Sequence, residues 1–226
     1  MRSVREDLID NSLNNSSSRN LFLFSGVSGV VGTCCYIVAI TVSMNPTVSY
    51  LVAMFWPILS IIFVFGLIHF NALTYDGFPN QLAGVFAYLA FGLVAAMISI
   101  QFAIELGIKT YTTNLSSNQR ELLTMVKPSL RLVDMGLDVA WDLFIGTSLI
   151  FLAFALKQNR KFEIWWSIPA GLLGILLIVL NSITFPWPPN TRGLIDVGPA
   201  IGTYIIAVSG RLLFIAVRMK NTTVEK

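Results

Sequence analysis

The residues of this chain that could do chemistry are a few acids and amides set inside or beside long apolar stretches. They are Gln101, Glu105, Asp138, Asp142, Asn181 and Asp196. A charged side chain inside a bilayer is expensive, so it usually pairs with another group, faces a cavity or marks a pathway. Carboxylate and amide oxygens accept hydrogen bonds and attract positive charge. These residue types therefore suit a site for a cation or a small polar solute.

Three of the acids share one face of a helix. Asp134, Asp138 and Asp142 follow one another at intervals of four residues, which aligns them along one side. If the helix begins at Asp138, then Asp142 lies about 6 Å inside the span, at about 1.5 Å per residue. We expect Asp142 to be the most important member of any site.

The composition indicates that a membrane positions these side chains. Of the 226 residues, 55% are hydrophobic and 12% are charged, whereas about a quarter of a soluble domain is charged. The net charge is +3, but the basic residues are scattered and are not interleaved with aromatic ones. Excess Lys and Arg in a membrane protein usually reflects cytoplasmic loops facing anionic lipid. We therefore expect the lipid bilayer as a partner and no nucleic acid.

Six stretches reach the roughly 20 apolar residues needed to cross a bilayer as a helix. They are residues 21–43, 48–70, 81–108, 138–156, 164–185 and 194–217. Lipid offers no partner for free backbone groups, and the runs are too long and continuous for barrel strands. The sequence predicts an all-α fold, a polytopic transmembrane helical bundle with six spans. The domain covers residues 21–218, between a polar leader (1–20), expected to be disordered or a loose surface helix, and a cytoplasmic tail (219–226).

The long loop at residues 109–137 is predicted to hold a short amphipathic helix on the outer interface. Asn118 and Glu121 have capping-box spacing, and apolar residues then recur at helical intervals, interrupted by Pro128.

Other local features also bear on the architecture. Pro57 predicts a kink in the second span, and the adjacent Cys34 and Cys35 are expected to be buried free thiols. The glycines of the first span allow a neighbouring helix to approach. The prolines of residues 185–189 cannot continue a helix and predict a stiff outer turn.

Orientation follows from the distribution of Lys and Arg. With the N-terminus inside, nine basic residues lie on the inner side and five on the outer side. The inner ones are Arg2, Arg5, Arg19, Lys157, Arg160, Lys161, Arg218, Lys220 and Lys226, and the outer ones are Lys109, Arg120, Lys127, Arg131 and Arg192. The protein is therefore predicted in the cell membrane, multi-pass, with both termini cytoplasmic.

This topology brings the polar residues of four helices to one membrane depth. Gln101, Glu105 and Asn181 fall near the outer ends of the third and fifth spans. The acids Asp138, Asp142 and Asp196 fall near the outer starts of the fourth and sixth spans. Two interpretations stay open. In one, the acids sit at the wet interface, favoured by the positive N-termini of their helices. In the other, they line an outward-open polar pocket, with Arg131 and Arg192 as counter-charges.

Two segments resemble a known group of proteins. One runs from Asn181 through Thr184-Phe185-Pro186, Pro188-Pro189 and Gly193-Leu194-Ile195-Asp196 to Gly198-Pro199, and the other is the phrase Gly136-Leu137-Asp138-Val139-Ala140-Trp141-Asp142. They resemble the last two helices and the fourth helix of uncharacterised prokaryotic six-helix integral membrane proteins, which are grouped as a domain of unknown function. The resemblance implies the six-helix architecture and no activity.

Most conventional chemistry is disfavoured by what the chain lacks. A common zinc site needs four ligands, and the chain has one histidine, His69, and two adjacent cysteines. No P-loop, dinucleotide fingerprint or Gly-x-Ser-x-Gly elbow occurs in the sequence. We expect no catalytic residue, metal or cofactor, and a non-enzymatic membrane protein that binds a ligand or partner through the outer polar cluster. The alternatives are a small solute or ion transporter or channel subunit, which could oligomerise, and a membrane enzyme acting on lipid.

Overall fold

The computed structural model describes residues 16–41, 48, 51–52, 54–74, 78–112, 115–157 and 162–219. Their regular elements are α2 (Ser16–Thr41), α4 (Phe55–Thr74), α5 (Phe78–Thr112), α6 (Ser117–Lys157), α7 (Ile164–Thr184), the 3-10 helix η1 (Pro189–Arg192) and α8 (Gly198–Arg218). No strand occurs in these ranges. The all-α fold class is therefore confirmed.

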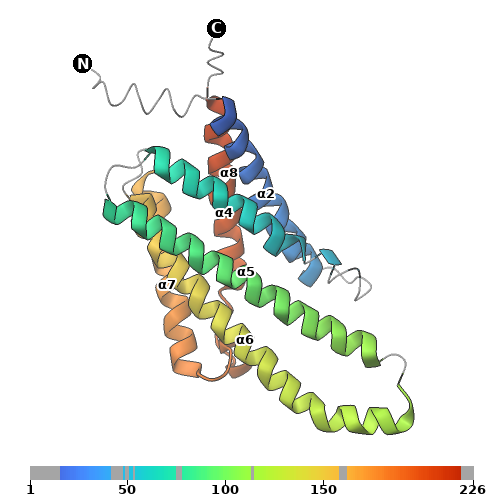
Figure 1. Ribbon diagram of the computed structural model, residues 1–226. Helices are drawn as coiled ribbons and strands as arrows, with labels where there is room; N and C mark the ends of the chain where they lie inside the picture. The colour runs from blue at the N-terminus through green and yellow to red at the C-terminus, as the bar shows by residue number, and fades with distance from the viewer. Residues whose placement is uncertain are drawn as a thin grey trace, which may run out of the picture.

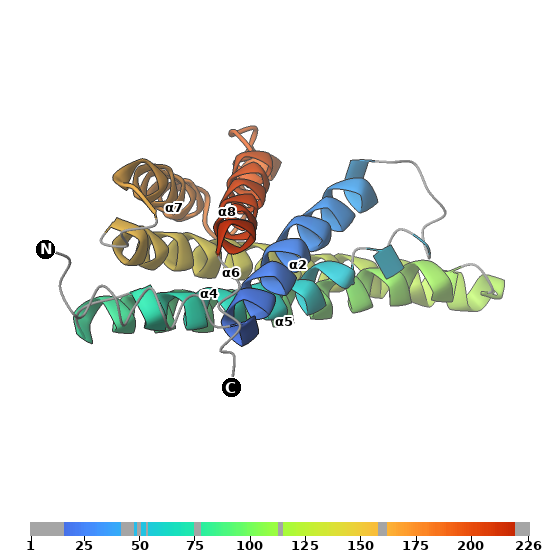
Figure 2. The same cartoon turned by 90° about the horizontal axis from the view of Figure 1, so that it is seen from above.

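The long helices form a ring in which neighbours in the chain pack on one another, except that α7 and α8 touch only slightly. α2 packs on α4, α4 on α5, α5 on α6 and α6 on α7, and α8 returns to pack on α2. Successive helices run back and forth along the bundle (Figure 1). The start of α2 and the end of α8 lie side by side. They are joined there by a hydrogen bond of 3.2 Å from Arg19 Nε to the carbonyl oxygen of Ala216. Seen from above, α7 and α8 lie on one side of the bundle and α4 and α5 on the other (Figure 2).

The apolar character of the helices extends to their outer surfaces. Among the described residues, four helical segments are long and apolar enough to cross a membrane: Ser16–Val38, Glu121–Lys157, Ile164–Thr184 and Gly198–Arg218. Along α7, the large side chains of Trp165, Leu172 and Ile183 are 72%, 64% and 70% exposed. A soluble monomer rarely leaves so continuous an apolar face in water. The pattern indicates a membrane-embedded protein whose helices face lipid.

The long loop predicted at residues 109–137 is mostly helix, so the prediction of a separate short helix is wrong. α5 continues to Thr112 and α6 is continuous from Ser117 through Pro128 to Lys157. No residue between the amphipathic stretch and the fourth span stops a helix, and one proline removes only one backbone donor. The ends of α5 and α6 form an arm that reaches away from the other helices (Figure 1).

The cap of α6 also differs from the prediction. Ser116, not Asn118, precedes the helix, and its backbone N–H donates to Gln119 Oε1 at 3.0 Å. The Ser116 hydroxyl is 3.0 Å from the same oxygen. This is a capping-box contact, two residues before the predicted one.

Other boundaries differ as well. α2 begins at Ser16, inside the predicted leader, whereas residues 1–15 and 220–226 lie outside the described part of the chain. Pro57 falls in the first turn of α4, which begins at Phe55, so the predicted mid-span kink is wrong. A proline in a first turn gives up an N–H that has no helical partner there. Cys34 and Cys35 are free, but they are exposed and half-buried rather than buried.

Small residues allow the close helix packing that the sequence predicted. A Cβ added to Gly29 or Gly32 of α2 would lie 2.8 Å from Phe63 or 2.9 Å from Leu59 of α4. Between α6 and α7, a Cβ on Gly174 would lie 2.5 Å from the carbonyl oxygen of Gly146. Backbones that approach this closely gain dispersion contacts, which drive helix association where lipid removes the hydrophobic effect.

A buried aromatic cluster fills the end of the bundle where α2 begins and α8 ends. The ring centroid of Phe70 lies 5.2 Å from that of Phe22 and 5.7 Å from that of Phe162, both edge-on. His69 of α4 lies beside them, 5.6 Å from Phe22, with its Nε2 3.2 Å from the Ser18 hydroxyl oxygen. His69 therefore joins α4 to α2. We name Phe22, Phe70 and Phe162 the aromatic plug.

Candidate functional site

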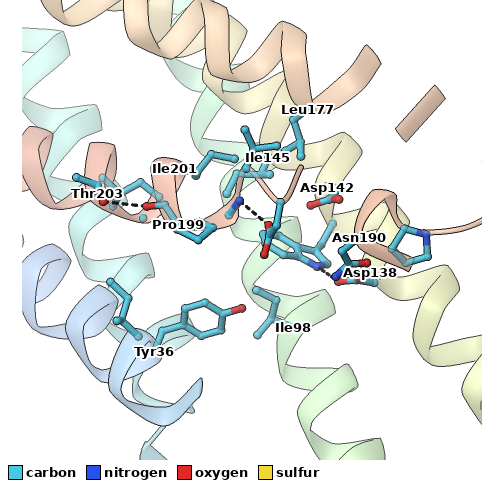
Figure 3. A pocket seen from close by; sticks show the side chains of 18 of the residues that line it. Tyr36, Ile98, Asp138, Asp142, Ile145, Leu177, Asn190, Pro199, Ile201 and Thr203 are labelled. Atoms are coloured by element: carbon cyan, nitrogen blue, oxygen red, sulfur yellow. Dashed lines mark hydrogen bonds between the residues drawn. The ribbon is translucent and has the colours of Figure 1, made fainter. Parts of the chain in front are cut away.

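A cavity of about 380 Å³ lies inside the ring of helices. Every long helix contributes to its wall, together with the proline-rich turn that joins α7 to α8. Pockets that bind small molecules typically measure about 300–1,000 Å³. Three aspartates line this cavity, Asp138, Asp142 and Asp196. In Figure 3, Asp138, Asp142 and Asn190 lie on one side, with Tyr36 and Thr203 across from them.

One face of α6 supplies the acidic wall. Asp138, Trp141, Asp142 and Ile145 all line the cavity, and their spacing of three, four and seven residues places them on one side of a helix. Trp141 Nε1 donates a hydrogen bond to Asp138 Oδ1 at 2.7 Å. This bond satisfies the indole donor and holds the indole ring beside the carboxylates.

Asn181 of α7 does not line the cavity itself but is hydrogen-bonded to residues that do. Its amide Nδ2 donates to Asp142 Oδ2 at 2.9 Å and to the Leu177 carbonyl oxygen at 3.0 Å. Both partners line the cavity. The residue is 1% exposed, and its Oδ1 has no hydrogen-bond partner among the described residues. A buried acceptor without a donor is uncommon in proteins and calls for an explanation, such as a bound water or ligand.

Asp196 belongs to the turn rather than to a span. α8 begins at Gly198, so the prediction that Asp196 lies inside the sixth helix is wrong. Its Oδ1 accepts a hydrogen bond from the Gly198 backbone N–H at 2.8 Å, and the residue is exposed. Asp196 therefore accepts a hydrogen bond from the N–H of the first residue of α8 and also lines the cavity.

One interpretation of the sequence is that the positive N-termini of helices stabilise these acids, but this applies to only one of them. α6 begins at Ser117, more than 20 residues before Asp138, which is about 30 Å along the axis. The field of a helix end falls off within its first turn. Asp196 lies at the start of a helix, but Asp138 and Asp142 do not, and the prediction that they do is wrong. Their position has to be explained by their surroundings.

Three other predicted residues, Gln101, Arg131 and Arg192, do not line this cavity. Gln101 is half-buried on α5 and does not line it, and the side chain of Glu105 is outside the described residues. Arg192 lies over the ring of Trp187, at 5.5 Å from its centroid, and lines a separate groove with Arg131. The predicted role of the two arginines as counter-charges inside the pocket is therefore wrong.

The sequence interpretation missed the aromatic part of the wall. Tyr36 of α2, Trp56 near the start of α4 and Trp141 of α6 line the cavity. Trp141 could have been found, because it is three residues from Asp138 and adjacent to Asp142. Tyr36 and Trp56 come from distant parts of the chain, and no local pattern links them to the acids.

Comparison with known proteins adds no relative: no protein family, no curated protein and no solved structure matches this chain. The resemblance to six-helix membrane proteins therefore stays an expectation from sequence.

Proposed function

We propose that this protein crosses the cell membrane six times and binds a positively charged ligand in the cavity beside Asp142. The proposal is of a binding protein without enzymatic activity. It rests on the cavity, on its carboxylates and on the composition of the helices that enclose it.

Six crossings fit the lengths and surfaces of α4 and α5. These helices have 20 and 35 residues, or about 30 and 52 Å, enough for a bilayer of about 30 Å. Their described apolar segments are Phe55–Val64 and Gly92–Ile104. Exposed apolar residues such as Ile58 and Leu89 suit lipid better than water.

We propose that both termini lie in the cytoplasm, which the excess of Lys and Arg on that side supports. Tags at the two ends should both be protected in intact cells and both become accessible after permeabilisation. Labelling of one end only in intact cells would contradict an even number of spans.

The single observation that carries the binding proposal is the environment of Asp142. None of the described residues that line the cavity is Lys, Arg or His, whereas three are aspartates. Within a membrane span a carboxylate such as that of Asp142 needs compensation. The hydrogen bond from Asn181 engages one oxygen of Asp142 and leaves the carboxylate able to interact with a cation.

The transporter alternative requires a path to the opposite end of the bundle. The aromatic plug lies at that end, and Phe22, Phe70 and Phe162 are almost completely buried. Packing of this kind leaves little space between the helices at that end and supports the proposal of a pocket that opens on the outer side only. Transport would need these rings to separate.

The test compares two carboxylates on the same helix. Asp142→Asn removes the charge but keeps an oxygen that can accept the Asn181 hydrogen bond, so the fold is retained. Asp134→Asn is the matched control, because Asp134 is on the same face but does not line the cavity. Thermal-shift and calorimetric titrations with cations should show binding to the wild type and to Asp134→Asn, and at least a ten-fold loss for Asp142→Asn. Equal binding by all three would overturn the proposal.

A further inference from the structure

We propose that the ligand of this cavity is an organic cation with an apolar body, for example a quaternary ammonium carrying an aromatic group. This inference rests on the proposed function and adds the chemical class of the ligand. Three properties of the cavity lead to it: its size, the composition of its wall and the arrangement of its acids.

The cavity is much larger than a bare ion. Its volume of about 380 Å³ is more than ten times the ~30 Å³ that one water occupies in the liquid. Calcium takes six to eight oxygen ligands at about 2.3–2.6 Å. Among the described residues no three of His, Cys, Asp or Glu are grouped so as to hold a metal ion. The carboxylates are therefore spread along the wall of a cavity and are not grouped around one bare metal ion.

Most of the wall is hydrocarbon and aromatic. Ile98, Ile145, Leu177, Ile201 and Ile205 line it together with the rings of the aromatic residues. Removing apolar surface from water is favourable, and a hydrated inorganic ion has no apolar surface to bury against this wall. An alkyl or aromatic group fits against this wall.

The aromatic rings also suit a cation directly. The centroid of Tyr36 lies 5.7 Å from that of Trp56, and both side chains line the cavity. Trp141 lies on the same wall as Asp138 and Asp142 and is held by its hydrogen bond to Asp138. Trp and Tyr attract cations over their faces, and such rings are the usual recognition elements for quaternary ammonium groups.

The ligand is thus expected to lie with its charge toward α6 and its apolar body across the cavity. Asp142 and Trp141 contact the ammonium group, whereas Tyr36 and the aliphatic wall contact the body. The Oδ1 of Asn181, which has no hydrogen-bond partner among the described residues, adds a buried acceptor next to Asp142 for a water carried with the ligand.

The experiment measures binding of benzyltrimethylammonium, tetramethylammonium and sodium to the detergent-solubilised full chain by calorimetry. We expect benzyltrimethylammonium to bind at least ten-fold more tightly than either of the others. Trp141→Leu should weaken the two organic cations about ten-fold and leave sodium unchanged. Tyr36→Leu, on a different helix, should act mainly on benzyltrimethylammonium. It also serves as the second variant should Trp141→Leu not fold.

A matched aromatic variant controls for general effects. Trp165→Leu removes an indole from the outer face of α7, where it is 72% exposed and does not line the cavity, so binding should not change. Asp142-dependent binding that ranks sodium equal to the organic cations and ignores Trp141 would overturn this inference and leave the proposed function standing. Absence of cation binding to folded wild-type protein would overturn both.

Discussion

The contact between Gly174 and Gly146 gives the sharpest structural prediction. A methyl group at Gly174 would lie 2.5 Å from the Gly146 carbonyl oxygen, 2.9 Å from Ile150 Cγ1 and 3.1 Å from the Ile150 backbone nitrogen. Two of these atoms belong to the backbone of α6 and cannot rotate away. Because non-bonded carbon contacts are optimal at about 3.5–4.0 Å, Gly174→Ala should push α6 and α7 about 1 Å apart.

The expected loss in stability follows from two opposing effects. Overpacking a close contact costs about 1–3 kcal/mol, whereas replacing glycine by alanine inside a helix gains up to about 1 kcal/mol. Gly171→Ala on the same helix has the second effect without the first, since its methyl group would meet Ala153 Cβ at an ordinary 3.5 Å. The free energy of unfolding of Gly174→Ala should therefore be about 1–3 kcal/mol below that of Gly171→Ala.

The assay is unfolding of both variants by titration with SDS in mixed micelles, followed by tryptophan fluorescence. The separation of α6 and α7 should also lengthen the hydrogen bond from Asn181 to Asp142, which is 2.9 Å in the wild type. Gly174→Ala should consequently lose ligand affinity as well as stability. Equal stability of the two variants would refute the packing of α6 against α7 described above.

Three further predictions concern other contacts. Gly66→Ala should destabilise the protein, because its methyl group would overlap the Ser25 side chain. Gly92→Ala is the control, since its methyl group would have nothing within 4 Å. Equal unfolding midpoints of the two variants would contradict the packing of α2 on α4. Asn181→Leu should lower the free energy of unfolding by about 1–3 kcal/mol, because the hydrogen bond to Asp142 is lost. A double-mutant cycle with Asp142→Leu should show that the two substitutions are coupled. Additive effects would count against that hydrogen bond. Cys34, exposed on apolar α2, should resist a charged maleimide in liposomes and react after transfer to SDS, and rapid labelling in liposomes would argue that this face of α2 meets water.

The sequence predicted the elements better than their ends. Apolar length identified α7 almost to the residue, since Glu163 precedes it and Thr184 is its last residue before Phe185 and Pro186. The boundaries of α6 were missed because the amphipathic segment and the fourth span are both helical, and nothing in the local pattern separates one long helix from two.

The site was predictable where spacing along one helix, or a shared depth in the membrane, brings residues together. Asp138 and Asp142 share a face by spacing alone, and depth in the membrane brought Asn181 to the same level. The aromatic residues Tyr36 and Trp56 depend on the ring closure of α2 against α4 and α8, a tertiary arrangement that hydropathy does not encode. Arg131 and Arg192 were wrongly assigned to the cavity, because a shared depth in the membrane does not determine on which side of the bundle a residue lies.

The most direct test of cation binding beside Asp142 is a crystal structure of the protein with 4-bromobenzyltrimethylammonium, recorded at the bromine absorption edge. The account predicts an anomalous peak inside the cavity, with the ammonium group next to Asp142 and Trp141. Bromine peaks confined to the outer, lipid-facing surfaces of the helices, with the cavity free of ligand density, would contradict it.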